Sequence, residues 1–108
     1  MRPFNKDNYF SSLNKIVTEE TKNFFNKSIL ITGANGLIGG TLLDFFLFLN
    51  SEYQAIISLS VIVRSRLDVH DFFRDQVINQ MIQSVEEPIH FASDLDYIFH
   101  AASNAHPK

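Results

Sequence analysis

The 108-residue sequence contains no cysteine and no tryptophan, and it has only four glycines and three prolines. The lack of cysteine excludes a disulfide framework and a thiolate metal site. The four histidines are scattered, with no carboxylate cluster beside them, so the sequence indicates no other metal site. With 45% hydrophobic and 19% charged residues, the composition is that of a globular protein, and the length fits one domain.

Long apolar runs and an excess of positive charge are also absent. Residues 1–7 are polar and lack the apolar segment of a signal peptide. The most apolar stretch, residues 37–49, is shorter than the ~20 residues that span a bilayer. The formal net charge of −3 argues against nucleic acid as the main partner. We therefore expect a cytoplasmic protein that binds neither nucleic acid nor a membrane.

Two kinds of apolar pattern alternate along the chain. Short apolar runs predict parallel strands at 28–33, 56–63, 79–85 and 97–102. Helical spacing predicts helices over 5–26, 36–50 and 68–78. The third strand has an alternative position at 89–91. Alternating strands and helices predict the α/β class, with right-handed crossovers and a parallel sheet of order 3-2-1-4.

The predicted fold is a partial doubly wound parallel sheet with an extra N-terminal helix. Residues 1–27 form a helical extension, and residues 28–108 form the sheet and its helices. The helix over 36–50 is apolar on nearly all faces, so we expect it to be buried or covered by a partner. The fourth strand has an unpaired edge. Both surfaces predict self-association.

Three glycines follow the first predicted strand with the spacing Gly-x-x-Gly-x-x-Gly. The first permits a sharp turn, the second lets a pyrophosphate approach the backbone, and the third lets the helix pack closely on the sheet. The free N–H groups of the helix start and the helix dipole favour phosphate. No Gly-Lys-Ser/Thr follows, which excludes a Walker loop. The alternative is a turn that binds nothing. The predicted cofactor-binding residues here are Gly33, Asn35, Gly36, Leu37, Ile38 and Gly39.

A second motif lies near the end of the chain. Residues 96–103 read Asp-Tyr-Ile-Phe-His-Ala-Ala-Ser, an apolar strand that ends in His-Ala-Ala. Together with the glycine motif, this segment resembles the extended short-chain dehydrogenase/reductase family, the NAD-dependent epimerase/dehydratase group. The resemblance covers residues 27–107. It implies that residues 28–108 are the N-terminal part of a dinucleotide-binding domain of Rossmann type. It further implies the NAD(P)-binding portion of a nucleotide-sugar epimerase, dehydratase or decarboxylase, with Ala101, Ala102 and Ser103 lining the cofactor crevice.

The end of the second strand bears on the choice between NAD and NADP. The NAD pattern has an acidic residue there to hold the ribose 2′-hydroxyl, but this sequence reads Val63-Arg64-Ser65-Arg66. A guanidinium matches a 2′-phosphate, so Arg64 favours NADP slightly. The alternatives are that both arginines are solvated, or that Arg64 stacks on the adenine of NAD.

The resemblance also implies an adenine contact at the end of the third strand. The family usually has an aspartate there, whereas this chain has Ser84 and Val85. Without the carboxylate, we expect backbone groups of Val85 to hold the adenine.

The catalytic pair of the family, Tyr-x-x-x-Lys, is missing from this chain. None of its three tyrosines is followed four places on by lysine. We therefore predict no catalytic residue and no turnover, and His100 is expected to be a packed or hydrogen-bonded strand residue. The alternative function is a short, non-catalytic nucleotide-sensing module. A methyltransferase-like domain is disfavoured, because the first strand lacks the acidic residue of such sites.

Overall fold

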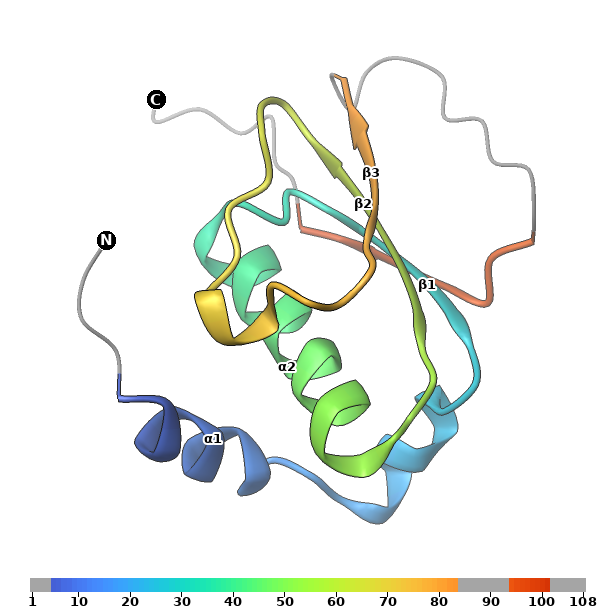
Figure 1. The fold of residues 1–108 in the computed structure, drawn as a ribbon. Helices are drawn as coiled ribbons and strands as arrows, with labels where there is room; N and C mark the ends of the chain where they lie inside the picture. Colours follow the sequence, from blue (N-terminus) through green and yellow to red (C-terminus); the bar gives the residue numbers. More distant parts are fainter. Residues whose placement is uncertain (1–4, 84–93, 102–108) are drawn as a thin grey trace, which may run out of the picture.

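The computed structural model describes residues 5–83 and 94–101. Its four strands form one parallel sheet of order β3-β2-β1-β4, which confirms the predicted α/β class and strand order (Figure 1). In chain order, the elements are α1 (Lys6–Asn14), the 3-10 helix η1 (Glu19–Phe24), β1 (Ser28–Thr32), α2 (Leu37–Tyr53), β2 (Ser58–Val63), the 3-10 helix η2 (Asp71–Phe73), β3 (Asn79–Ile82) and β4 (Tyr97–His100).

Strand β1 lies at the centre of the sheet and explains the continuous apolar run that predicted it. Its residues Ile29, Leu30 and Ile31 are fully buried. In the parallel register, Ile31 stands beside Val61 of β2 on one side and Phe99 of β4 on the other. Because the strands are parallel, the carboxyl ends of all four lie at the same edge of the sheet, and the glycine motif follows β1 at that edge.

Helix α2 packs on one face of the sheet and forms the core with it. Phe46 and Leu47 are buried, and Phe46 contacts Phe99 of β4 at 5.6 Å between ring centroids. The helix ends three residues later than the predicted end at Asn50. The Asn50 side chain does not cap the helix; its amide donates to the Ile57 carbonyl and its oxygen accepts from the Ile57 N–H.

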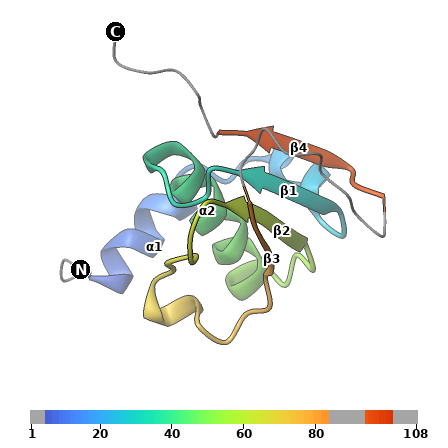
Figure 2. The ribbon, with the colours of Figure 1, turned by 90° about the horizontal axis from the view of Figure 1, so that it is seen from above.

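The helices in the described part of the chain all lie on the same side of the sheet (Figure 2). The second layer of helices that a doubly wound sheet has therefore remains a prediction. None of the helices described is long and apolar enough to cross a membrane.

The N-terminal extension is not the single helix predicted over 5–26. The chain breaks after α1, and Thr18 is extended with φ −133° and ψ 178° before η1 begins. The break re-aims the aromatic residues. Phe10 of α1 packs on Phe48, whereas Phe24 of η1 packs on Phe46 and Tyr97. These contacts bury apolar side chains of α2 from within the same chain, which is the first of the two alternatives predicted for this helix, so this face gives no support to the prediction of self-association.

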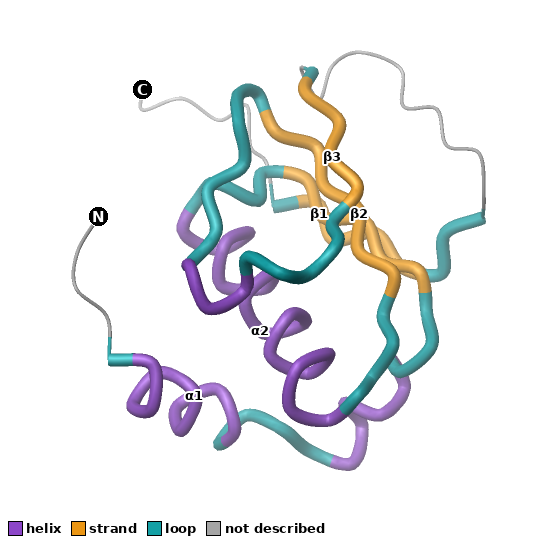
Figure 3. The backbone as a smooth tube through the Cα atoms, viewed as in Figure 1, coloured by secondary structure: helices purple, strands orange, loops and turns teal. Residues whose placement is uncertain are grey.

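The helix predicted over 68–78 is also wrong. The connection from β2 to β3 is irregular, and η2 is its only helical turn (Figure 3). Side chains of this segment reach elements far away in the sequence: Phe73 stacks on Phe10 at 5.7 Å, and the Gln76 amide donates to the Leu47 carbonyl. These contacts outweigh the weak helical preference of a polar segment.

Candidate functional site

The glycine motif forms a tight turn at the carboxyl edge of the sheet. Gly33 adopts the left-handed conformation with φ 72°, which favours glycine strongly. Its N–H donates to the Ile62 carbonyl at 3.1 Å, and its own carbonyl accepts from the Gly36 N–H at 2.9 Å. The turn therefore reverses the chain immediately after β1, and Gly36 becomes the N-cap of α2.

The third glycine is required by a close approach of α2 to this turn. A Cβ atom on Gly39 would lie 2.1 Å from the Gly33 carbonyl oxygen and 3.2 Å from Cβ of Ala101. The helix therefore lies directly against the turn and the end of β4. This geometry agrees with the packing role predicted for Gly39, and it brings predicted site residues from two distant segments together.

The N-terminus of α2 is open on its outer side. Leu37 is 89% exposed and Ile38 is 70% exposed, although both are large and apolar. The first N–H groups of a helix have no partner within the helix, and a helix of 17 residues carries a full dipole. The motif therefore combines exposed backbone donors with positive potential, the combination that favours an anion.

A cavity of about 210 Å³ lies beside the glycine turn, between the ends of β1 and β2. Arg64 and Ser65, the residues predicted to meet the adenosine ribose, line this cavity. Both are exposed, and no acidic side chain lines the cavity. The full lining is Gly33, Asn35, Gly36, Ile62, Val63, Arg64, Ser65 and Gln83.

Gln83 is a lining residue that sequence reasoning missed. It follows β3, and its N–H donates to the Val63 carbonyl at 2.9 Å. The third strand was predicted to end at residue 85 and instead ends at Ile82, so the strand-end position shifts toward Gln83. The predicted adenine contacts Ser84 and Val85, and the alternative strand at 89–91, lie outside the described residues, as do Ala102 and Ser103.

The Asn35 side chain has a structural partner of its own. Its amide nitrogen donates to the Arg66 carbonyl at 2.9 Å, and its oxygen accepts from the Asp68 N–H at 3.1 Å. Asn35 therefore ties the glycine turn to the segment after β2. The sequence placed Asn35 at the site but contained no signal for this pairing, because its partners are backbone groups.

His100 lies at the end of β4 and is hydrogen-bonded, which is one of the two structural roles predicted for it. Its Nδ1 is 2.9 Å from Oγ1 of Thr32, which is fully buried at the end of β1. In the described residues, no group of three or more His, Cys, Asp or Glu is arranged to hold a metal.

Comparisons with protein-family models, with curated proteins and with solved structures found no match to this chain. The fold and the site geometry are therefore the observations from which the function is argued.

Proposed function

We propose that this chain binds NAD or NADP through the glycine turn, as the cofactor-binding portion of a nucleotide-sugar epimerase, dehydratase or decarboxylase. The observation that carries the proposal is the approach of Gly39 to the Gly33 carbonyl, 2.1 Å from an added Cβ. This approach directs the open start of α2 toward the edge where β1 and β4 end. Dinucleotides bind at such a topological switch point in doubly wound sheets.

The proposed pose follows from the polarity of the edge. The pyrophosphate lies over Gly36, where no side chain blocks the N–H groups of Leu37 and Ile38. The adenosine half enters the cavity of about 210 Å³, and the nicotinamide half passes toward Ala101. The cavity wall formed by Arg64 and Ser65 supports NADP slightly over NAD, because a guanidinium pairs with a 2′-phosphate.

In a nucleotide-sugar epimerase, dehydratase or decarboxylase, the nicotinamide takes a hydride from the sugar. This chain has no Tyr-x-x-x-Lys pair to move the accompanying proton. We therefore expect cofactor binding without turnover from this polypeptide, and the nucleotide-sugar substrate belongs to the enzyme as a whole.

The test is calorimetric titration of the purified chain with NAD⁺ and NADP⁺, repeated on two glycine variants. In Gly36→Ala, the new Cβ lies 3.3 Å from the Gly33 oxygen, a tight contact that a small shift relieves. We therefore expect the variant to fold, with its methyl group in the proposed pyrophosphate path. Gly40→Ala is the matched control. Its Cβ makes a similarly tight contact, 3.2 Å from the Ala34 oxygen, but Gly40 does not line the cavity of about 210 Å³.

We expect Gly36→Ala to weaken binding at least about tenfold, a loss of about 1.4 kcal/mol, and Gly40→Ala to leave it unchanged. Equal affinities in all three proteins would refute pyrophosphate binding at the turn. Tighter binding of NAD⁺ than of NADP⁺ to the parent chain would remove the 2′-phosphate role of Arg64.

The alternative is a non-catalytic nucleotide-sensing module. It is favoured by one observation, that α1 and η1 cover the apolar face of α2 from within the same chain. A folded monomer in light scattering that binds the nucleotide would support the sensing module. Self-association of the chain, together with Tyr-x-x-x-Lys further along the source gene, would support the enzyme portion.

A further inference from the structure

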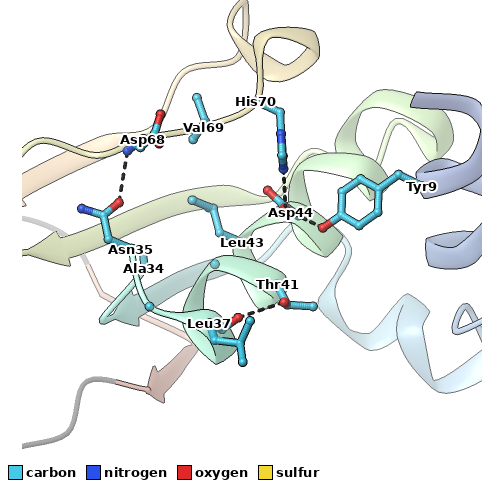
Figure 4. Close-up of a pocket in the computed structure, with 12 residues that line it drawn as sticks. Tyr9, Ala34, Asn35, Leu37, Thr41, Leu43, Asp44, Asp68, Val69 and His70 are labelled. Carbon is cyan, nitrogen blue, oxygen red and sulfur yellow. Dashed lines mark hydrogen bonds and ion pairs between the residues drawn. The ribbon is translucent and has the colours of Figure 1, made fainter. Parts of the chain in front are cut away.

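A three-residue cluster joins the N-terminal extension to the segment that follows β2. The Tyr9 hydroxyl of α1 donates to Oδ2 of Asp44 on α2 at 2.5 Å. Nε2 of His70 lies 3.5 Å from the same carboxylate oxygen. Figure 4 shows the three side chains converging from three different elements. The Asp44 and His70 side chains are only 13% and 19% exposed, so water screens the pair weakly.

Burial and the neighbouring side chains shift the pKa values of Asp44 and Tyr9. Burial raises the pKa of the Asp44 carboxyl, while the Tyr9 hydrogen bond and the charge of His70 oppose that rise. Burial and the adjacent Asp44 raise the pKa of Tyr9 above its usual range, so its hydroxyl remains a donor at neutral pH. Aromatic contacts hold the other two groups in place: the His70 ring stacks on Phe72 at 5.0 Å and meets the edge of the Tyr9 ring at 5.6 Å.

The segment from Arg64 to His70 is held at two places. Asn35 binds the backbone of Arg66 and Asp68, and Asp44 binds the side chain of His70. Beneath the segment lies a cavity of about 840 Å³, whose lining includes Asn35, Asp44, Asp68 and His70. Leu67 and Val69 of the segment pack against the hydrophobic core, and the two polar anchors hold the segment where it passes over the cavity. Its position there therefore depends on the two polar anchors as well as on this packing.

We propose that Asp44, together with Tyr9 and His70, is a positioning residue that fixes the position of Arg64. Through Arg64 it sets the affinity for the 2′-phosphate on the adenosine ribose of NADP. The inference rests on the proposed function, since Arg64 and Ser65 line the cavity assigned to adenosine. It makes α1, which lies outside the predicted dinucleotide-binding part, a component of cofactor discrimination.

Two measurements on the full chain test the proposal, using Asp44→Asn and Tyr9→Phe. Asp44→Asn keeps the shape and an acceptor for Tyr9 but removes the charge that attracts His70, and Tyr9→Phe removes only the hydroxyl. Glu52→Gln is the control, because it neutralises an exposed acid on the same helix, away from the segment. The first measurement is amide hydrogen exchange over residues 66–70, which needs no ligand. The second is the ratio of the dissociation constants of NAD⁺ and NADP⁺.

We expect both variants to speed exchange over residues 66–70, with Asp68 as the reporter, while amides of β1 and α2 keep their rates. We expect Asp44→Asn to weaken NADP⁺ binding about tenfold and to change NAD⁺ binding less than about twofold. Glu52→Gln is expected to change neither quantity.

Unchanged exchange over 66–70 in both variants would overturn the positioning role, whatever the nucleotide does. Faster exchange with an unchanged NAD⁺ to NADP⁺ ratio would overturn the role in discrimination. If the parent chain binds neither nucleotide, the proposed function fails and the discrimination role fails with it. The exchange data from the same proteins distinguish that result from a failure of the anchors.

Discussion

The β1–β2 and β2–β3 connections lie on the same face of one parallel sheet, yet only the first is a regular helix. The first contains α2, with 17 helical residues, whereas the second contains the three-residue η2 and is otherwise irregular. Both connections were predicted to be helices from the spacing of their apolar residues. That spacing therefore does not distinguish the connection that forms a regular helix from the one that stays irregular.

The two connections differ in what their side chains contact. Helix α2 is apolar on nearly all faces, and it is packed between the sheet and the N-terminal extension, so a regular helix buries most of its apolar side chains, apart from Leu37 and Ile38 at its start. The second connection is anchored by individual side chains: His70 to Asp44, Phe73 to Phe10 and Gln76 to the Leu47 carbonyl. Contacts with elements distant in the sequence thus decide the local conformation.

The largest expected effect tests whether the irregular connection is as much a part of the core as the helix. Phe46 of α2 and Phe73 of η2 are each 1% exposed. We expect Phe46→Ala and Phe73→Ala each to lower the free energy of unfolding by about 3–5 kcal/mol in urea denaturation. The control is Val77→Ala, because Val77 is 87% exposed, and we expect a change within about 0.5 kcal/mol. A loss below about 1 kcal/mol for Phe73→Ala alone would show that the second connection is peripheral.

The next effect concerns how the first connection is joined to β1. Gly39→Ala places a Cβ 2.1 Å from the Gly33 oxygen, a backbone atom that moves only if the turn moves. We expect a loss of about 1–3 kcal/mol in the free energy of unfolding. Gly40→Ala is expected to change it by less than about 1 kcal/mol, because the helix preference of alanine offsets the tighter contact. Equal losses in the two variants would contradict the close approach seen at Gly39.

The smallest effect concerns the polar anchor of the second connection. The pKa of Asp44 is raised in the folded state, so the folded protein holds that proton more tightly than the unfolded chain. The stability that this group contributes is complete below its unfolded pKa of about 4, and it is lost as the pH rises through the raised value. Asp44→Asn has no titrating carboxyl group at this position. We therefore expect the parent to lose stability relative to the variant as the pH rises from about 4.

Thermal unfolding at several pH values measures this difference. The series is repeated in a His70→Gln background, because the interaction with His70 opposes the rise in the Asp44 pKa. A difference that stays constant with pH in both backgrounds would show that Asp44 titrates normally.

Much of the fold was predictable because each strand carried a local signal. The apolar run that became β1 is buried on both faces, and the alternation of strands and helices led to the observed strand order. The glycine motif was likewise predictable as a turn, since Gly33 and Gly39 meet steric demands that other residues do not. The ends of the elements were predicted less accurately. The predicted end of α2 was wrong because the Asn50 side chain is hydrogen-bonded to Ile57 and does not cap its own helix.

The polar parts of the site were not predictable in the same way. Asn35 was placed in the glycine motif as a ligand contact, but its side chain binds the backbone of Arg66 and Asp68. Gln83 entered the cavity lining because β3 ends earlier than its apolar pattern indicated. Both outcomes depend on backbone groups, and a sequence carries no residue-specific signal for such partners.

The sequence by itself determined the parallel sheet, its order and the glycine turn. The strands follow from periodicity within short segments, their order from the right-handed crossover rule, and the turn from the steric limits of single residues. Only the tertiary structure decided that the N-terminal extension divides into two helices, that residues 68–78 remain irregular and that Tyr9, Asp44 and His70 meet. The physical reason is that these features arise from contacts between residues as many as 73 positions apart, as between Phe24 and Tyr97. The energies of such contacts exceed the small local preference for a helix.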